Sequence, residues 1–341
     1  MRTPGSGPSR RRPWIRIALG AVFVIAVAGY GTASFIVYDG VGKAPRACWP
    51  ADAANTPTGY VVPGEFDQGL PAANPMPAPQ EVTFRSRDAQ IPNARLAAWW
   101  IPAEGTDAPA VVLVHGVQSC RREASVLLAA GMLHRNGFSV FLMDIRDHGD
   151  SEGDDARFAG GSEEYLDVLG AWDWVRSQGV PAGRIGLLGF SFGSVNAVVA
   201  GAREPSVAAV WADSSSTTMY EGIRLFLKDQ LKDGSGLTGI LVPGAILWAR
   251  IIAGDDLTRF DPIEQVDAYA GRSIAFVHGA EDQVLPAAMA IELHDRAVAA
   301  GAKTPDAWIV PAAMHTQGIY LDPAGYERRM VGFFGTALGA P

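Results

Sequence analysis

The ten residues Arg184-Ile185-Gly186-Leu187-Leu188-Gly189-Phe190-Ser191-Phe192-Gly193 decide the fold class. Residues 184–190 form a short apolar run typical of a buried strand, and residues 192–203 have the pattern of a helix rich in small side chains. The pentapeptide from Gly189 to Gly193 is Gly-x-Ser-x-Gly, which in a strand–turn–helix context predicts a sharp turn that exposes the central hydroxyl. Ser191 is therefore the candidate nucleophile, with an ordinary glycine-rich turn as the alternative.

Strands and helices alternate on both sides of this turn. Further short apolar runs lie at 110–114, 140–145, 207–211, 274–277 and 307–310, preceded by two β-segments at 81–88 and 95–101. Further helical patterns lie at 123–136, 163–178, 286–300 and 323–338. Uninterrupted apolar strands that alternate with helices predict an α/β fold, with a mostly parallel eight-stranded sheet covered by helices on both faces.

Residues 214–271 interrupt the alternation, because they are too many for a simple crossover, and we interpret them as an inserted helical cap. Two apolar stretches, 222–231 and 237–254, predict its helices, and Pro243-Gly244 is expected to break the second. The cap is interpreted as a lid that buries these side chains against the body. An apolar pocket or membrane-facing entrance for acyl or lipid-like substrates is the alternative.

Four blocks in a fixed order carry a resemblance to a known family. They are Val114-His115-Gly116-Val117, the run from Asp144 to Gly153 (DIRDHGDSEG), the Gly-Phe-Ser-Phe-Gly turn, and His278-Gly279-Ala280-Glu281-Asp282-Gln283-Val284-Leu285-Pro286 followed by His315. Over residues 80–338 the chain resembles the α/β-hydrolase superfamily, in particular its membrane-anchored, prolyl-oligopeptidase-like serine hydrolases. The resemblance implies the α/β-hydrolase fold and a Ser-acid-His triad in that chain order.

The general base and its carboxylate follow from this pattern. A serine hydroxyl needs a neighbouring imidazole to take its proton, and His315 occupies the loop after the final strand, where the superfamily places its base. The other histidines fall inside helices or at loop starts, where we expect structural roles. Asp282 matches the acid of the family pattern, with the adjacent Glu281 as competitor.

Backbone donors for the tetrahedral oxyanion are expected from Val117 and Phe192, with Gln118 as an alternative to Val117. The run from Asp144 to Gly153 has Asp147 where the family pattern has Gly, and we assign it the fixing of loops and no chemistry. Its acidic residues Glu152, Asp154 and Asp155 lack the spacing of a cation site and are interpreted as a solvated loop. No cofactor and no metal are expected.

The N-terminus predicts a membrane anchor. Residues 17–37 carry no charge, and this length of 21 residues is close to what a helix needs to cross the hydrocarbon. Five arginines and no acid lie in residues 1–38, so the positive-inside rule places the N-terminus in the cytoplasm and the body outside. A signal cleaved after Ala26-Val27-Ala28, a weak twin-arginine export signal and a buried core helix are the alternatives.

The predicted organisation is a basic leader at 1–16, an anchor at 17–38, a Pro-rich linker at 39–80 and the hydrolase domain at 81–341. Eight prolines in 42–80 indicate a stiff, irregular tether. Cys48 in the linker and Cys120 in the body could form a disulfide or remain free thiols. The net charge of −8 and the two cysteines exclude a phosphate-tracking nucleic-acid binder and a four-cysteine zinc site.

Together these features predict a membrane-anchored serine hydrolase that cleaves a small-molecule ester, or a thioester or amide, through an acyl-enzyme on Ser191. An esterase is favoured over a peptidase because esters need less assistance to their leaving group. An acyltransferase with the same triad and a non-catalytic binding domain of the same fold are the alternatives. The pattern indicates neither the acyl-chain length nor the oligomeric state.

Overall fold

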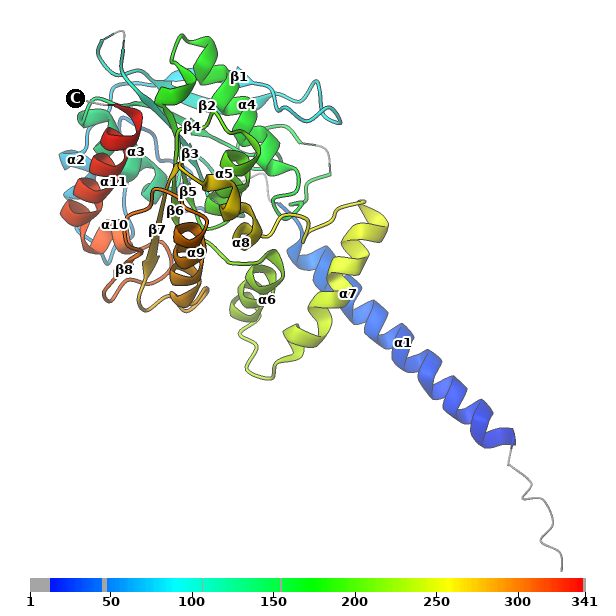
Figure 1. Cartoon of the computed structure of the whole chain (residues 1–341). Coiled ribbons are helices and arrows are strands. Elements are labelled where there is room, and N and C mark those ends of the chain that lie inside the picture. The colour runs from blue at the N-terminus through cyan, green and yellow to red at the C-terminus, as the bar shows by residue number, and fades with distance from the viewer. Residues whose placement is uncertain (1–12, 45–47, 106, 154, 340–341) are drawn as a thin grey trace, which may run out of the picture.

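The computed structural model describes residues 13–44, 48–105, 107–153 and 155–339 and contains one eight-stranded sheet (Figure 1). The strand order is β1-β2-β4-β3-β5-β6-β7-β8, in which β1, β2 and β4 pair antiparallel and all other neighbours pair parallel. The strands are β1 Gln80–Phe84, β2 Leu96–Ile101, β3 Ala110–Val114, β4 Ser139–Met143, β5 Ile185–Phe190, β6 Ala209–Asp213, β7 Ser273–Gly279 and β8 Trp308–Val310. The mostly parallel eight-stranded sheet predicted from the alternating pattern is confirmed.

Helices cover both faces of this sheet (Figure 1). One face packs against α3 Ala124–Arg135, α10 Gly318–Leu321 and α11 Pro323–Leu338. The other face packs against α4 Glu164–Ser177, α5 Phe192–Arg203 and α9 Ala288–Ala299, with η1 Ala182–Arg184 leading into β5. Side chains alternate between the two cores along a single strand. In β3, Val111 and Leu113 pack into the core on the α3 side of the sheet, and Val112 packs into the core on the α5 side. This alternation is expected for a strand buried on both sides.

Each predicted strand and sheet-covering helix is present within a few residues. The ranges predicted at 110–114, 192–203 and 323–338 coincide with β3, α5 and α11. The largest differences are at β1, which ends at Phe84, and at β6, which lies two residues after the predicted run. At β6 the apolar run begins at Val207, whose amide bonds back to Glu204 in the turn before the strand.

The cap is helical, with α6 Met219–Gln230, α7 Leu237–Ile252, α8 Pro262–Gln265 and η2 Val266–Tyr269. The predicted break at Pro243-Gly244 is wrong, because α7 continues through Pro243. Packing of α7 against α1 outweighs the loss of the helix hydrogen bond that Pro243, which has no N–H, cannot donate. Gly244 lies where α1 comes so close that a Cβ atom would stand 2.2 Å from Ser34 Oγ, and the Tyr30 hydroxyl donates to the Ile240 carbonyl at 3.1 Å.

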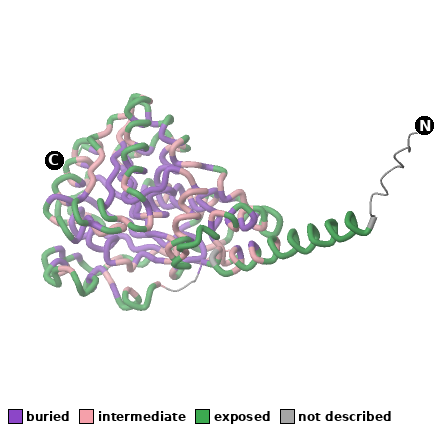
Figure 2. The backbone as a smooth tube through the Cα atoms, turned by 90° about the horizontal axis from the view of Figure 1, so that it is seen from below, coloured by how far each residue is buried: buried purple, intermediate pink, exposed green. Residues whose placement is uncertain are grey.

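Helix α1, Pro13–Val41, extends away from the domain as a largely exposed rod (Figures 1 and 2). Its segment Trp14–Gly40 has 27 residues and a mean hydropathy of 1.9, long and apolar enough to cross a membrane. Of the predicted basic leader, residues 1–12 lie outside the described part of the chain.

The Pro-rich segment lies on the domain instead of hanging from it. Its short helix α2, Leu70–Ala73, and the buried Tyr60, Val62 and Met76 pack into the core on the α3 side of the sheet. Cys48 and Cys120 form a disulfide with their Cα atoms 5.3 Å apart, which resolves the choice between a bridge and free thiols. The segment is therefore tied to the loop that follows β3.

Candidate active site

Ser191 occupies a strained turn between β5 and α5. Its backbone has φ of +52°, a conformation that non-glycine residues rarely adopt, and its amide donates to the Asp213 carbonyl of β6 at 2.9 Å. A Cβ atom on Gly189 would stand 2.2 Å from the Gly193 carbonyl oxygen, and one on Gly193 would stand 2.3 Å from that of Val114. The two glycines of the motif are thus required by close backbone approach, and the turn holds the Ser191 side chain at the carboxyl end of the sheet.

His315 lies within hydrogen-bond distance of Ser191. Its Nε2 atom is 2.8 Å from Ser191 Oγ, and its Nδ1 atom is 2.7 Å from Asp282 Oδ2. An imidazole with its hydrogen on Nδ1 satisfies both contacts, since Nε2 is then free to accept the serine proton. The three predicted residues, separated by up to 124 positions in the chain, are brought together.

Asp282 holds its position through several hydrogen bonds. Its side chain is fully shielded from solvent, and Oδ1 accepts the amides of Val284 and Leu285 at 2.8 and 2.9 Å. Burial opposes its charge, but hydrogen bonds from His278 and His315 outweigh burial and hold the pKa of Asp282 well below its usual range. The competitor Glu281 is exposed on the surface.

His278 contacts the same carboxylate, which the sequence reasoning missed. This buried side chain at the end of β7 places Nε2 at 2.9 Å from both Asp282 Oδ2 and the Leu285 carbonyl. Burial disfavours the imidazolium, yet the hydrogen bond to Asp282 outweighs it and raises the pKa of His278. The spacing of four residues between His278 and Asp282, across the strand end, was the available signal.

Two backbone amides beside Ser191 are open for an oxyanion. Among the described residues, neither the amide of Val117 nor that of Phe192 has a hydrogen-bond partner. The amide of Gln118 instead donates to His148 Nε2 at 3.1 Å, which removes the alternative donor. The two residues predicted as oxyanion donors both line the cavity that contains Ser191.

His115 and His148 shape this loop as neutral side chains. His115 Nδ1 donates to the Gly116 carbonyl at 2.7 Å and Nε2 accepts the Ile145 amide at 3.2 Å, while His148 Nδ1 donates to the Arg146 carbonyl at 2.8 Å. Burial lowers the pKa of His115 to about 4, and burial together with His115 lowers the pKa of His148 to about 4. Each ring must accept a hydrogen bond from a backbone amide, so the neutral form is the one that fits.

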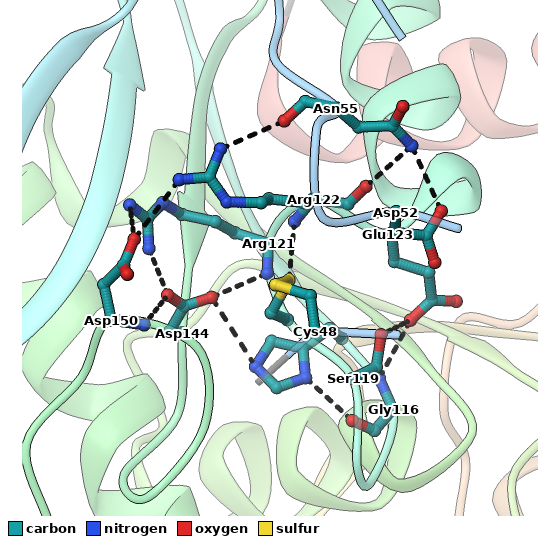
Figure 3. Close-up of a disulfide and its surroundings, with 12 residues drawn as sticks. Cys48, Asp52, Asn55, Gly116, Ser119, Arg121, Arg122, Glu123, Asp144 and Asp150 are labelled. Atoms are coloured by element: carbon teal, nitrogen blue, oxygen red, sulfur yellow. Dashed lines mark hydrogen bonds and ion pairs between the residues drawn. A yellow bond between two sulfur atoms is a disulfide. The ribbon is translucent and has the colours of Figure 1, made fainter. Parts of the chain in front are cut away.

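The run from Asp144 to Gly153 packs beneath the loop, in the loop-fixing position expected for it. Asp144 accepts the amide and the guanidinium of Arg121, and Arg121 also contacts Asp150 at 2.7 Å (Figure 3). The disulfide lies beside this cluster, one residue before Arg121 (Figure 3). Asp147 has φ of +60°, which explains why glycine is usual at that position.

A second buried cluster supports the loop of His315. Ser214 follows β6 with φ of +56°, donates to Asp213 at 2.8 Å and accepts the Thr316 amide at 3.2 Å. Tyr326 of α11 donates to the other Asp213 oxygen at 2.7 Å. Sequence reasoning missed this support, although Asp213 ends a strand at the same sheet edge as the site.

Two hollows of different character meet at Ser191. An apolar cavity of about 60 Å³ lies between α5 and α6 and is lined by Phe158, Phe192, Met219, Ile223 and Phe226, among others. A wider, more polar hollow of about 320 Å³ is lined by His315, Asp52, Glu123, Trp49 and Tyr320, among others.

Within the described residues, no group of three or more His, Cys, Asp and Glu side chains is arranged to hold a metal ion. Of the acidic run near the site, Glu152 binds Arg95 at 2.7 Å, and Asp154 lies outside the described residues.

One family model matches part of the chain, and many solved structures resemble it. The model of the X-Pro dipeptidyl-peptidase (S15 family) matches residues 94–242. No curated protein matches the sequence. Among solved structures, an esterase of Pyrococcus furiosus has 20% identity and a TM-score of 0.63 over 88% of this chain and 99% of its own.

Two other solved structures extend this similarity. An α/β hydrolase from Penicillium has 17% identity and a TM-score of 0.59 over 77% of this chain and 100% of its own. The acylaminoacyl peptidase of Pyrococcus horikoshii has 18% identity and a TM-score of 0.54 over 80% of this chain and 44% of its own. With the sheet order and the strand–turn–helix at Ser191, these similarities show that the chain has the α/β-hydrolase fold.

Proposed function

We propose that the chain is a membrane-anchored serine hydrolase that cleaves a carboxylic ester, or a thioester or amide, through an acyl-enzyme. The contact of His315 with both Ser191 Oγ and Asp282 is the observation that carries the proposal, because it gives the serine a base and the base a carboxylate. The open amides of Val117 and Phe192 add an electrophilic site next to the nucleophile.

The proposed reaction has two halves. Ser191 Oγ attacks the substrate carbonyl carbon while His315 Nε2 takes the serine proton, and the amides of Val117 and Phe192 stabilise the oxyanion. His315 gives this proton to the leaving oxygen, the bond to the leaving group breaks, and the acyl group remains on Ser191. A water molecule, deprotonated by His315, then releases the acid and restores the serine.

An amide substrate is the second candidate, because the matching family model is that of a peptidase. The hollow beside His315 includes Asp52 and Glu123, whose carboxylates could face a peptide amino group. We favour an ester because the acyl side of the site is narrow and apolar. X-Pro p-nitroanilides and p-nitrophenyl esters, assayed side by side, separate the two.

The location of the enzyme is part of the proposal. Helix α1 is only 6% buried over its most apolar window, unlike the core helix of a soluble domain. Its N-terminal side carries the arginines, so we place the N-terminus in the cytoplasm and the catalytic domain outside. The Cys48–Cys120 disulfide supports this placement, since disulfides persist in oxidising compartments.

Labelling with a fluorophosphonate probe tests the nucleophile. We expect the wild type and the exposed-site control Ser206→Ala to be labelled, and Ser191→Ala to be unlabelled and inactive on p-nitrophenyl butyrate. Full labelling of Ser191→Ala would show that another residue is the nucleophile. Absence of labelling in every variant would favour a binding domain, and ester products formed with added alcohols would favour an acyltransferase.

A further inference from the structure

We infer that the cleft between α1, α6 and α7 is a binding site for the acyl chain of a bilayer lipid, which reaches Ser191 from the membrane side. The inference rests on the proposed function and names its substrate class. It follows from the position of α7, the side chains that α7 exposes, and the cavities between α7 and Ser191.

Helix α7 crosses α1 inside the segment predicted to span the membrane (Figure 1). The Trp248 indole donates to the Gly31 carbonyl at 2.8 Å, the Phe35 and Trp248 rings meet edge to face at 5.6 Å, and Ser34 touches Gly244. At a rise of about 1.5 Å per residue, Ser34 lies roughly 6 Å inside the outer end of the predicted span at residue 38. A helix in contact with Ser34 therefore lies at the depth of the lipid tails nearest the outer surface.

The outward face of α7 is suited to that depth. It exposes five large aliphatic side chains, Leu237, Ile240, Leu247, Ile251 and Ile252. The helix contains one charged residue, Arg250, which pairs with Asp256 at 2.7 Å near its C-terminal end. An exposed aliphatic face of this kind is costly in water and favourable in a bilayer, where a helix lying in the interface buries it among acyl chains.

A narrow apolar cavity lies between α1, α6 and α7, next to the apolar cavity at Ser191. It has a volume of about 30 Å³ and is lined by Tyr38 of α1, Leu227 of α6, and Ala245 and Ile246 of α7. Phe158, Ile223 and Phe226 line both this cavity and the apolar cavity at Ser191, so they form the wall between the two. Phe226 also lines the polar hollow beside His315 and is partly exposed.

An acyl chain that enters between α1 and α7 would thus pass from lipid to Ser191 without crossing water. Its carbonyl would meet the amides of Val117 and Phe192, and its polar leaving group would extend into the larger hollow. This geometry selects long, unbranched acyl esters that are dissolved in the membrane.

The test uses the full chain in phosphatidylcholine–phosphatidylglycerol vesicles with p-nitrophenyl palmitate and p-nitrophenyl butyrate. Ala245→Phe fills the α1–α7 cavity without reaching the cavity at Ser191. We expect it to lower the rate on palmitate roughly tenfold or more, since each methylene left in water weakens binding about fourfold. The butyrate rate should stay within about twofold of wild type, since its chain ends in the first cavity. Equal effects of Ala245→Phe on both esters would overturn the inference.

A second measurement does not depend on activity or on a buried substitution. Leu247→Cys and the matched control Val298→Cys, on α9, replace residues that are 56% and 52% exposed, and each receives a nitroxide label. We expect the label at 247 to be relaxed by oxygen dissolved in lipid and the label at 298 by an aqueous nickel complex. Aqueous accessibility at 247 would refute the membrane position of α7. Loss of butyrate hydrolysis in the wild type would instead refute the proposed hydrolase, while leaving the depth measurement informative.

Discussion

At the scale of single residues, the carboxylate of Asp282 serves two histidines at once. It accepts His315 Nδ1 at 2.7 Å and lies 2.9 Å from His278 Nε2, while Val284 and Leu285 fix its other oxygen. Because four donors converge on it, the carboxylate has one orientation, and that orientation fixes the hydrogen of His315 on Nδ1. The acid is the residue that controls the tautomer of His315, and Asp282 makes that contact.

Replacing the acid tests this control. Asp282→Asn should lower kcat on p-nitrophenyl butyrate by about 10³- to 10⁴-fold, because an amide NH₂ facing His315 favours the wrong tautomer. Glu281→Gln should change kcat less than about twofold, because an exposed surface side chain contributes little. Circular dichroism checks that both variants fold. A larger loss in Glu281→Gln than in Asp282→Asn would reverse the assignment.

His148 holds the loop of the proposed oxyanion donor Val117 by accepting the Gln118 amide at 3.1 Å. His148→Phe keeps a ring in place but removes this acceptor, so the loop that carries Val117 should shift. We expect kcat to fall roughly tenfold to a hundredfold, less than the ~10²–10³ that follows outright loss of an oxyanion donor. KM should change little, since the acyl cavity is untouched. The surface substitution His294→Phe serves as the control, and an equal loss there would contradict the interpretation.

The same variant has a characteristic dependence of stability on pH. The pKa of His148 is lowered from 6.5 to about 4 by burial and by His115, so folding favours the neutral ring. The contribution of His148 to stability is present in full above pH 6.5, where its ring is neutral in the unfolded state too. This contribution is lost as the pH falls towards 4, because the ring is protonated in the unfolded state first. The gap in unfolding free energy between wild type and His148→Phe should shrink by about 3 kcal/mol from pH 8 to pH 4.

Denaturant unfolding in detergent at a series of pH values measures this gap. Burial raises the pKa of Glu164 to about 7, so Glu164 changes stability with pH in the opposite direction to His148. Both proteins contain Glu164, so comparing them cancels this effect. A gap that does not change with pH would mean that folding does not shift the pKa of His148.

Some residues of the site could be predicted from the sequence and others could not, for a physical reason. Ser191, Asp282 and His315 each end or follow a strand, so the sheet itself brings them to one edge, and their motifs identify them. The residues that support these three side chains are harder to predict from the sequence. Ser214 supports Thr316 only because the chain turns with a positive φ at both residues, and that geometry has no pattern in the sequence.

At the scale of elements, the disulfide joins the proline-rich segment to the active-site loop. Cys120 lies between Ser119, which donates to Glu123 at 2.7 Å, and Arg121, which binds Asp144 and Asp150 (Figure 3). Asn55 adds a contact from the same segment, since its side chain donates to the Arg122 carbonyl at 3.2 Å. The segment thus restrains the loop that begins at the proposed oxyanion donor Val117.

Removing the bridge should cost stability. The double variant Cys48→Ser, Cys120→Ser should lose about 2–4 kcal/mol of unfolding free energy, the typical contribution of a disulfide. Dithiothreitol should lower the denaturation midpoint of the wild type and leave that of the double variant unchanged. A wild type whose midpoint is insensitive to reductant would show that the disulfide contributes nothing.

Helix α7 shows where patterns within one element fail. Pro243-Gly244 is a strong local signal for a break, yet α7 is continuous because α1 packs against it at Gly244. Residues in α1 and α7 are about 210 positions apart, as in the Tyr30–Ile240 hydrogen bond, so no local window could contain both. By contrast, β3, α5 and α11 were predicted accurately because their periodic apolar faces contact a sheet that the same pattern already implies.

At the scale of the whole molecule, the exposed part of α1 and the end of α11 lie on different sides of the domain (Figure 1). The last helix, α11, ends at Leu338 against the sheet, far from the exposed part of α1, so a reporter fused there does not obstruct the membrane. The two predicted states of the N-terminus, anchor and cleaved signal, leave the domain on the same side of the membrane and differ in its attachment.

Reporter fusions and membrane extraction then test the placement as a whole. Alkaline phosphatase fused after the C-terminus should be active and green fluorescent protein dark, because the arginines of residues 1–16 retain the N-terminus in the cytoplasm and direct the domain outward. The fusion should stay with the membrane after an alkaline carbonate wash and keep the mass of the full chain. Release of a shorter protein would identify a cleaved signal. A fluorescent green fluorescent protein fusion together with an inactive phosphatase fusion would show that the orientation is the reverse of the one proposed. In that reversed case the domain would lie in a reducing compartment, and a thiol reagent should find Cys48 and Cys120 free, so the state of the disulfide provides an independent check on the same prediction.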